Sequence, residues 1–388
     1  MEKTFISEFY PQANIITPND GAHYFFGYYD MRATQQNRHL AHRVSFMDRL
    51  PRADDVAQLG YLENGEFMQF ASTTAWNFQQ GAMLQYHPFL ADTVCYNAFA
   101  GRKACTVTHN YRTGEKKYTD RAAACISPDG KWGLAVNFGR IFAFRAGYGY
   151  AGSVDEYAQE NAPAEDGIFL TDMESGSSRL LISYAILAQC CGYAPEEKIL
   201  VNHITFSPDS RRYVALIRNF PVPPVRGWKT SMVIGDLEGN IWVILPKTYI
   251  SHYVWADNTY LFAHCSAEDP GKKSMYRISA DDGSWKEYDM PLFHRKGETD
   301  LHCNISPGGG YIIGDTYPKD GYRSIEAINL ETGACRTLLQ VKTVIPANPD
   351  IRCDLHNRYV FDGRFISYDT TQNGNRQIAL VDISALNF

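Results

Sequence analysis

Short apolar segments with alternating polar positions run along the whole chain, separated by turns rich in Gly, Pro, Asn and Asp. This period of two predicts β-strands. Three segments share a longer template: a strand ends at a turn resembling Ser-Pro-Asp-Gly, a second strand follows, and a third ends at a Leu-x-x-Gly-like turn. They are residues 202–245, 301–341 and 122–183. Repetition at this period predicts a β-propeller, because a four-stranded blade buries both faces only between neighbouring blades.

Weaker copies of the template raise the number of predicted blades to seven. They occupy residues 23–73, 81–120, 251–290 and 354–385. The last copy lacks a clear fourth strand, so we expect the N-terminal residues 5–17, which have spare strand character, to close the ring. The sequence thus predicts an all-β, seven-bladed β-propeller of four-stranded antiparallel blades, with residues 1–388 as a single domain. The alternative is a pair of stacked β-sandwiches, which need no turn signature at so long a period.

Composition and charge narrow the possible partners. The formal net charge is -6 and no long basic run occurs, which argues against nucleic acid. No apolar stretch is long enough to span a bilayer, and the N-terminus lacks the apolar core of a signal peptide. We therefore expect no membrane partner and a cytoplasmic location, or a periplasmic one if a leader has been removed. The nine cysteines include no C-x-x-C pair, which fits reduced, buried thiols. No G-x-G-x-x-G motif occurs, so no nucleotide cofactor is expected. The oligomeric state is left open.

Four histidines stand near the start of the first strand in four consecutive blades, where a propeller brings side chains together at one mouth of its channel. They are His203, His252, His302 and His356. Two of them belong to repeated Asp-Leu-His tripeptides, at 300–302 and 354–356, so we expect each aspartate to orient the histidine of its own tripeptide. Imidazole ligands suit Zn²⁺ or Mn²⁺ better than Ca²⁺. The alternative is that these histidines hydrogen-bond to the backbone of the next blade.

Further polar residues are expected at the same face. A second ring near the ends of the second strands comprises Asn97, Asn137, Asn219, His264, Asp315 and Asp369. The loops between second and third strands carry Arg145, Tyr148 and Tyr150 in residues 141–167, Arg226 and Trp228 after Pro221, and Tyr322 and Arg323. Arginines beside aromatic residues suit a carboxylated sugar, so we expect Trp228, Asn97, His264 and Arg323 to bind substrate. The alternative is that Arg145 and Arg226 are solvated loop charges. His87 and His109 map to other places and are interpreted as structural.

Several motifs resemble one family. FGYYD (26–30), WNFQQGAMLQY (76–86), the stretch 137–150, NHITFSP (202–208) and RCDLHNRYVFDG (352–363) are similar to segments of the seven-bladed propeller polysaccharide lyases, which include oligogalacturonate, ulvan and rhamnosyl-glucuronate lyases. The resemblance implies β-elimination at a 4-linked uronic acid, in which a base removes the C5 proton while positive charge neutralises the carboxylate. It implies Tyr150 or Tyr148 for proton transfer, Arg145 and Arg226 for charge, and the four histidines for metal. The histidine pair of ulvan-type members has no counterpart, which leaves the base unassigned.

Two other functions are compatible with the sequence. A glycoside hydrolase needs two carboxylates flanking the scissile bond, and Asp315 and Asp369 are the candidates. A propeller without catalytic activity, binding carbohydrate or protein, is the second alternative, because the fold does not determine the function.

Overall fold

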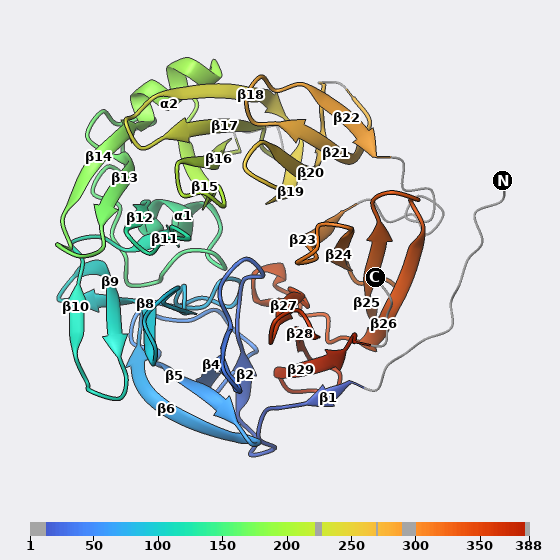
Figure 1. The fold of residues 1–388 in the computed structure, drawn as a ribbon. Helices are drawn as coiled ribbons and strands as arrows, with labels where there is room; N and C mark the ends of the chain where they lie inside the picture. Colours follow the sequence, from blue (N-terminus) through green and yellow to red (C-terminus); the bar gives the residue numbers. More distant parts are fainter. Residues whose placement is uncertain (1–12, 222–226, 269–270, 289–299, 385–388) are drawn as a thin grey trace.

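The computed structural model describes residues 13–221, 227–268, 271–288 and 300–384. Seven antiparallel sheets stand around a common axis as the blades of a propeller, as Figure 1 shows in the view along that axis. The predicted seven-bladed β-propeller is therefore confirmed.

The first three blades follow the chain in order. Blade 1 contains β2 (His23–Phe25), β4 (Arg38–Val44), β5 (Ala57–Glu63) and β6 (Glu66–Thr73), with the short β3 (Thr34–Gln35) paired to β4. Blade 2 contains β7 (Gln85–Tyr86), β8 (Thr93–Ala100), β9 (Lys103–Asn110) and β10 (Lys116–Tyr118). Blade 3 contains β11 (Ala123–Ile126), β12 (Trp132–Ala135), β13 (Gly167–Asp172) and β14 (Ser178–Ser183).

The next three blades repeat the arrangement. Blade 4 contains β15 (Ile199–Phe206), β16 (Arg212–Asn219), β17 (Thr230–Asp236) and β18 (Ile241–Thr248). Blade 5 contains β19 (Ile250–Trp255), β20 (Tyr260–Ser266), β21 (Lys273–Ser279) and β22 (Trp285–Tyr288). Blade 6 contains β23 (Leu301–Ile305), β24 (Tyr311–Thr316), β25 (Tyr322–Asn329) and β26 (Cys335–Lys342).

The last blade joins the two ends of the chain. Blade 7 contains β27 (Arg358–Val360), β28 (Phe365–Thr370) and β29 (Gln377–Asp382), and its outer strand is β1 (Asn14–Ile15) from the N-terminal segment. Asn14 pairs with Leu380 and Ile15 with Ala379. The prediction that the N-terminal segment closes the ring is confirmed.

The repeated Ser-Pro-Asp turn is held by its own side chains. In blade 4, the Ser207 hydroxyl donates to the Asp209 carboxylate (2.6 Å) and accepts from the backbone N–H of Arg212 (3.0 Å). Ser127 and Asp129 form the same bond in blade 3, also at 2.6 Å. These short polar side chains satisfy the backbone inside the turn where the innermost strands of blades 3 and 4 reverse into their second strands.

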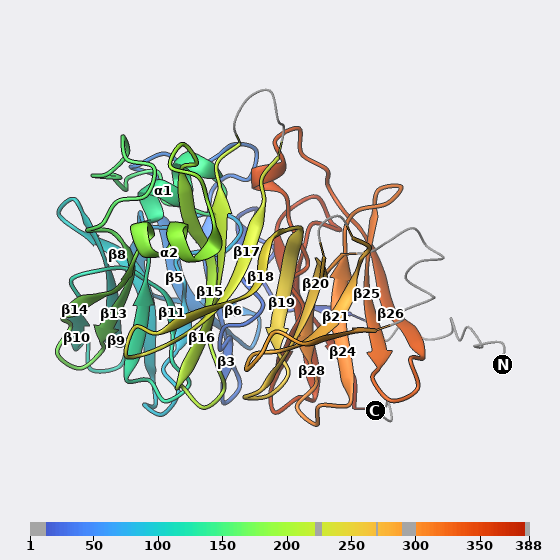
Figure 2. The same ribbon diagram turned by 90° about the horizontal axis from the view of Figure 1, so that it is seen from above.

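Three helical segments interrupt the strands. α1 (Phe138–Phe144) is capped by Asn137, α2 (Tyr184–Cys191) by Ser183 and Gly192, and the 3₁₀ turn η1 (Pro349–Ile351) by Asn348. The segment 141–167, expected as a loop, thus begins inside α1. Figure 2 shows α1 above the strands at one face of the ring. No helix in the described part of the chain is long and apolar enough to cross a bilayer.

The segment between β2 and β3 runs through the middle of the ring (Figure 1). Backbone N–H groups of Phe26 and Gly27 donate to Asp369 of blade 7, and the Tyr29 hydroxyl donates to the Tyr253 carbonyl of blade 5 (3.2 Å). Gly27 has φ +111°, and a Cβ there would lie 2.8 Å from the carbonyl carbon of Gln80. Only glycine fits this position. The segment therefore divides the channel into two mouths.

Candidate functional site

The four histidines do converge at one mouth of the channel. The rings of His252 and His302 lie 4.1 Å apart between centroids, and those of His302 and His356 lie 4.6 Å apart. His203 stacks on Tyr28 at 5.4 Å, and Tyr28 also contacts His356. All four histidines are at least nine-tenths buried. The innermost strands and the central segment between β2 and β3 together bring them into one cluster.

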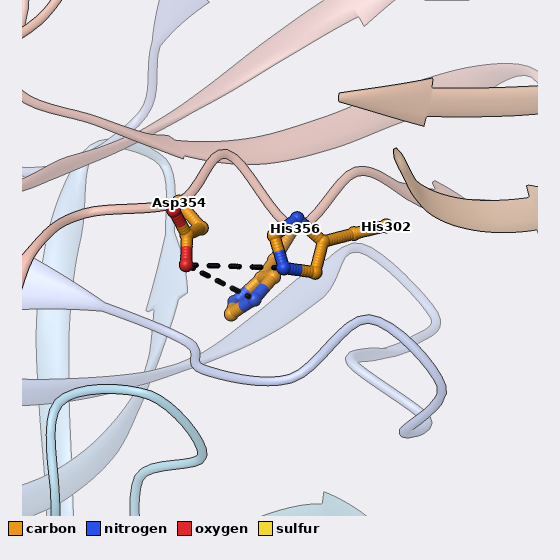
Figure 3. Close-up of side chains that lie close together, drawn as sticks. All are labelled: His302, Asp354 and His356. Atoms are coloured by element: carbon orange, nitrogen blue, oxygen red, sulfur yellow. Dashed lines mark ion pairs between the residues drawn. The ribbon is translucent and has the colours of Figure 1, made fainter. Parts of the chain in front are cut away.

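Two of these histidines form a possible metal site with an aspartate. His302, Asp354 and His356 offer ligand atoms that all lie within 4.8 Å of one another, the one such group among the described residues. Figure 3 shows both imidazoles directed at the Asp354 carboxylate, whose Oδ2 lies 3.8 Å from His302 Nε2 and 3.9 Å from His356 Nε2. Of the four predicted histidines, His302 and His356 belong to this group and His203 and His252 do not, and the third member of the group is a carboxylate.

Each imidazole holds its outer nitrogen in a hydrogen bond and directs Nε2 into the site. The neutral His356 presents a lone pair there, and His302 does so once it has lost its Nε2 proton. His356 Nδ1 donates to the Gly27 carbonyl (2.9 Å), and His302 Nδ1 bonds to Asp315 (2.9 Å). Each Nε2 is buried and has no hydrogen-bond partner. Asp354 Oδ2 accepts no hydrogen bond of normal geometry, although Arg352 Nη2 lies 2.7 Å from it. Two orphaned imidazole nitrogens beside a carboxylate fit a divalent ion such as Zn²⁺ or Mn²⁺, because such ligands keep their second nitrogen hydrogen-bonded.

The backbone at His356 is strained to serve this arrangement. His356 has φ +44°, a region that side chains with a Cβ rarely adopt. Both its backbone N–H and that of Leu355 donate to Asp315 Oδ2 (3.3 and 2.8 Å). A residue held in this region costs about 1–3 kcal/mol and persists only where surrounding bonds fix it. Asp315 therefore positions one ligand through its ring and the other through its backbone.

The pKa values of the two imidazoles are shifted in opposite directions. Burial lowers the pKa of His302, but Asp315 and Asp354 raise it more, to about 9. Burial and the neighbouring His302 hold the pKa of His356 well below its usual range. Burial alone would raise the pKa of Asp354, but Arg352 and Arg323 hold this pKa well below its ordinary value. The cluster thus contains an ionised carboxylate and one neutral imidazole before any ion binds.

Asp300 serves a different histidine from the one expected. Its Oδ1 bonds to His252 Nδ1 (2.9 Å) and lies 3.2 Å from His264 Nδ1, both in blade 5. The expectation that Asp300 orients His302 of its own tripeptide is wrong, because Leu301 begins β23 and Asp300 precedes the strand. Burial lowers the pKa of His252 to about 4, so its ring is neutral at neutral pH. With Nδ1 bonded to a carboxylate, Nε2 carries the lone pair.

Arginines line a cavity of about 280 Å³ beside the cluster. Arg145, Arg323 and Arg352 form one wall, with Tyr317 at 5.9 Å from Arg323 and 5.8 Å from Arg352. The Tyr317 ring also lies 5.7 Å from that of His302. Tyr317 therefore lines the cavity and also contacts the histidine cluster.

Arg218 adds a buried guanidinium without a carboxylate partner among the described residues. It is 4% exposed, bonds to Asn202 and to the Ile250 carbonyl, and its Nε has no acceptor. Burial and the nearby Arg145 lower its pKa to about 10. Trp228 lies between them, 5.7 Å from Arg218 and 5.9 Å from Arg145. Two neighbouring cations with so little compensating charge form a natural anion site.

The two candidate tyrosines have different surroundings. The Tyr148 hydroxyl accepts from Arg352 (3.1 Å), and Arg145 lies 4.6 Å from its ring. Burial opposes the effect, but Arg352 and Arg145 lower the Tyr148 pKa below its ordinary value. Tyr150 is fully buried, stacks on Phe138 at 4.2 Å and bonds to Asn97. Burial raises the Tyr150 pKa. The structure therefore brings Tyr148 to the arginines and keeps Tyr150 in the core.

The other predicted site residues are divided in the same way: some lie beside the arginines and others are buried in the core. Arg323 pairs with Asp354 (2.7 Å), and Trp228 lies beside the arginines with 40% of its surface exposed. His264 is buried against Asp300. Asn97 is fully buried and bonds to Ala123, Thr106 and Tyr150, so it is not available to a ligand. Arg226 lies outside the described residues.

The two carboxylates proposed for hydrolysis are both engaged in hydrogen bonds and ion pairs within the protein. Asp315 is fully buried on His302 and on the backbone of blade 7. Asp369, 2% exposed, accepts from Phe26, Gly27 and Arg358. An acid–base pair for glycoside hydrolysis must flank the sugar with room for water. These two residues do not meet that condition.

Sequence reasoning missed Arg218 and Arg352, and it expected Asp354 only to orient His356. Arg218 is the last residue but one of a buried strand, where a charged residue is rare unless it has a role. This position in the strand is the sequence signal that could have identified Arg218. Arg352 and Asp354 lie in the irregular segment before β27, where no periodicity predicts which way a side chain points.

No protein-family model and no curated protein sequence matches the chain. Solved structures do match. An oligogalacturonate lyase in complex with manganese superposes over 98% of both chains, with a TM-score of 0.63 and 12% identity. The oligogalacturonate lyase of Vibrio parahaemolyticus gives the same score and identity over 98% of this chain and 96% of its own. The GH74 xyloglucanase of Xanthomonas campestris is less similar, with a TM-score of 0.52 and 10% identity, and 54% of its length is covered. The predicted resemblance to the propeller lyases is confirmed for the fold.

Proposed function

We propose that the chain is a lyase that cleaves oligosaccharides at a 4-linked uronic acid by β-elimination. The observation that carries this proposal is the juxtaposition of His302, Asp354 and His356 with a cavity walled by arginines. The C5 proton of a uronate is weakly acidic, so an enzyme must neutralise the carboxylate before a base removes that proton. Positive charge fixed in advance around the carboxylate is the usual source of such stabilisation.

Arg218 and Arg145 are the proposed carboxylate receptors. Arg218 has no acidic partner in the described chain, and Arg145 makes only a 3.4 Å contact with Asp350. A carboxylate placed between them relieves their mutual repulsion and the unsatisfied Nε of Arg218. The faces of Trp228 and Tyr317 offer stacking surfaces to the sugar rings on either side.

His252 and Tyr148 are the proposed proton-transfer pair. His252 is neutral and its free Nε2 accepts the C5 proton; the electrons of the C5–H bond form the C4–C5 double bond. The C4–O4 bond breaks with its electrons on O4, which takes the proton of the Tyr148 hydroxyl. Arg352 and Arg145 make that phenol a stronger acid than an ordinary tyrosine. Asp300 stabilises the imidazolium of His252. Water then returns both groups to their starting state.

His302, Asp354 and His356 would hold a divalent ion. When bound, the ion supplies positive charge that acidifies the C5 proton. Asp315 and the Gly27 carbonyl keep the two imidazoles aimed at the site, and Arg323 and Arg352 hold the carboxylate of Asp354. These contacts keep the ligands in place without requiring the backbone to move.

Ultraviolet absorbance tests the proposal directly. The protein is incubated with Mn²⁺ and with oligosaccharides of galacturonate, of glucuronate and of rhamnosyl-glucuronate. We expect an absorbance from the unsaturated uronate to grow in step with new reducing ends on at least one of them. New reducing ends without that absorbance would instead support a hydrolase. Neither signal on any of the three would contradict the proposed activity and leave a binding protein.

A further inference from the structure

A second cavity, of about 670 Å³, lies at the mouth of the channel opposite the histidines. Pro128, Pro208 and Pro307 line it, and each belongs to a Ser-Pro turn at the end of an innermost strand, whereas the histidines stand at or near the starts. The volume lies within the range of small-molecule sites. Tyr29 closes the inner end, with its ring 6.0 Å from that of His302. The two mouths therefore stand back to back without sharing their outer walls.

Two charged groups face this cavity with unused hydrogen-bonding capacity. No described residue donates to the Asp30 carboxylate apart from its own backbone, and the side chain is exposed to the cavity. Arg32 donates from Nε to the Tyr86 carbonyl (3.0 Å), while its buried Nη2 has no acceptor. Because Nη2 is buried away from the cavity, a ligand there can bond to the Asp30 carboxylate and to Nη1 of Arg32, which donates to no described residue.

Aromatic side chains form much of the remaining wall. Tyr29 and Tyr253 lie at the inner end, and Trp255 and Tyr359 lie half-buried farther out. The Trp255 indole N–H is held by the Thr205 carbonyl (3.4 Å), which fixes the ring. A flat ring held in this way provides a surface on which an apolar ligand face can stack.

The charge balance disfavours an anionic ligand. Asp30 and Arg32 compensate each other, the other arginine of the cavity, Arg358, is paired with Asp369 (2.9 Å), and the carboxylate of Asp362 adds a further negative charge. The mouth that holds the histidines, called the catalytic mouth below, has more positive charge. Four arginines lie there, and they pair with only two carboxylates, Asp350 and Asp354: the arginines are Arg145, Arg218, Arg323 and Arg352. An anionic sugar is therefore drawn to the catalytic mouth and gains nothing at the opposite one.

We propose that the mouth opposite the histidines binds a neutral saccharide unit. Its hydroxyl groups donate to Asp30 and accept from Arg32 Nη1, and one face of the sugar ring lies on Trp255. This binding site does not depend on the proposed elimination reaction. The chain would then have a second saccharide-binding site, at the mouth opposite the proposed catalytic residues.

Saturation-transfer NMR tests the site with D-galactose, D-glucose, L-rhamnose and cellobiose as separate probes. We expect transfer to at least one of them, reduced about tenfold or more by Trp255→Ala and by Asp30→Asn, because the first removes the stacking surface and the second the charged hydrogen-bond acceptor. Trp228→Ala, which removes a half-exposed tryptophan from the catalytic mouth, is the matched control and should leave the transfer intact. Thermal unfolding of each variant checks that the fold persists.

Two outcomes would overturn this inference. One is the absence of transfer to all four neutral sugars in the native protein. The other is transfer that Trp228→Ala abolishes and Trp255→Ala leaves unchanged, which would assign the neutral sugar to the catalytic mouth. A parallel titration with galacturonate separates this proposal from the elimination. Its signal should survive Trp255→Ala, whatever the neutral sugars do.

Discussion

Replacing His252 by Gln is expected to lower kcat for uronate elimination about a thousandfold, within the 10²–10⁴ range typical of a general base. Glutamine preserves much of the volume and can still bond to Asp300, but it offers no nitrogen basic enough to take the C5 proton. The measurement is the initial rate of unsaturated-product absorbance at saturating oligosaccharide. KM should change little, because the residue acts after the substrate has bound.

Two comparisons make this expectation specific. His109→Gln replaces another buried histidine, which lies in β9 against Phe70 and Tyr96, and should retain activity. Tyr148→Phe should fail on oligosaccharides but recover on a 4-deoxy-4-fluoro uronate, since fluoride leaves without a proton, whereas His252→Gln should fail on both. Near-normal turnover by folded His252→Gln would remove His252 from the mechanism.

Replacing His356 by Ala is expected to reduce affinity for Mn²⁺ or Zn²⁺ by more than about a hundredfold. Removing merely an outer partner of a metal ligand already costs 10–100-fold. His356 contributes one of the two orphaned Nε2 atoms, and its ring is held by the Gly27 carbonyl. Metal analysis after dialysis against a defined metal buffer measures the loss. Elimination activity should disappear with the metal and return only at high added Mn²⁺.

His203→Gln is the matched control for this loss. His203 is equally buried in the same cluster, but its Nδ1 lies 3.3 Å from the Tyr28 hydroxyl and it is not part of the metal group. We expect this variant to keep its metal. If His203→Gln loses the ion while His356→Ala retains it, the ligand set is wrong.

The sequence predicted the blades because the information for them is local. The bonds between Ser207 and Asp209 and between Ser127 and Asp129 form within one turn, so the motif is visible in the chain itself. The N-terminal strand was predicted because the last blade lacked an outer strand. Helix α2 was missed, although Ser183 and Gly192 are ordinary cap residues, because eight residues fit equally well between two expected strands.

The site was harder to predict because its bonds join residues far apart in the sequence. Asp300 reaches His252, forty-eight residues away, and the Gly27 carbonyl binds the ring of His356, 329 residues away. The repeated Asp-Leu-His tripeptide suggested equivalent geometry, but Asp354 and His356 lie in irregular chain with His356 at a positive φ. Repetition therefore predicted where the histidines gather, and could not predict which atoms face one another.

Anomalous diffraction from a crystal soaked in Mn²⁺ would locate the metal and its ligands. We expect one strong peak bound by His302 Nε2, Asp354 Oδ2 and His356 Nε2. A peak coordinated instead by His203 and His252, or no peak at this mouth under saturating Mn²⁺, would contradict this expectation.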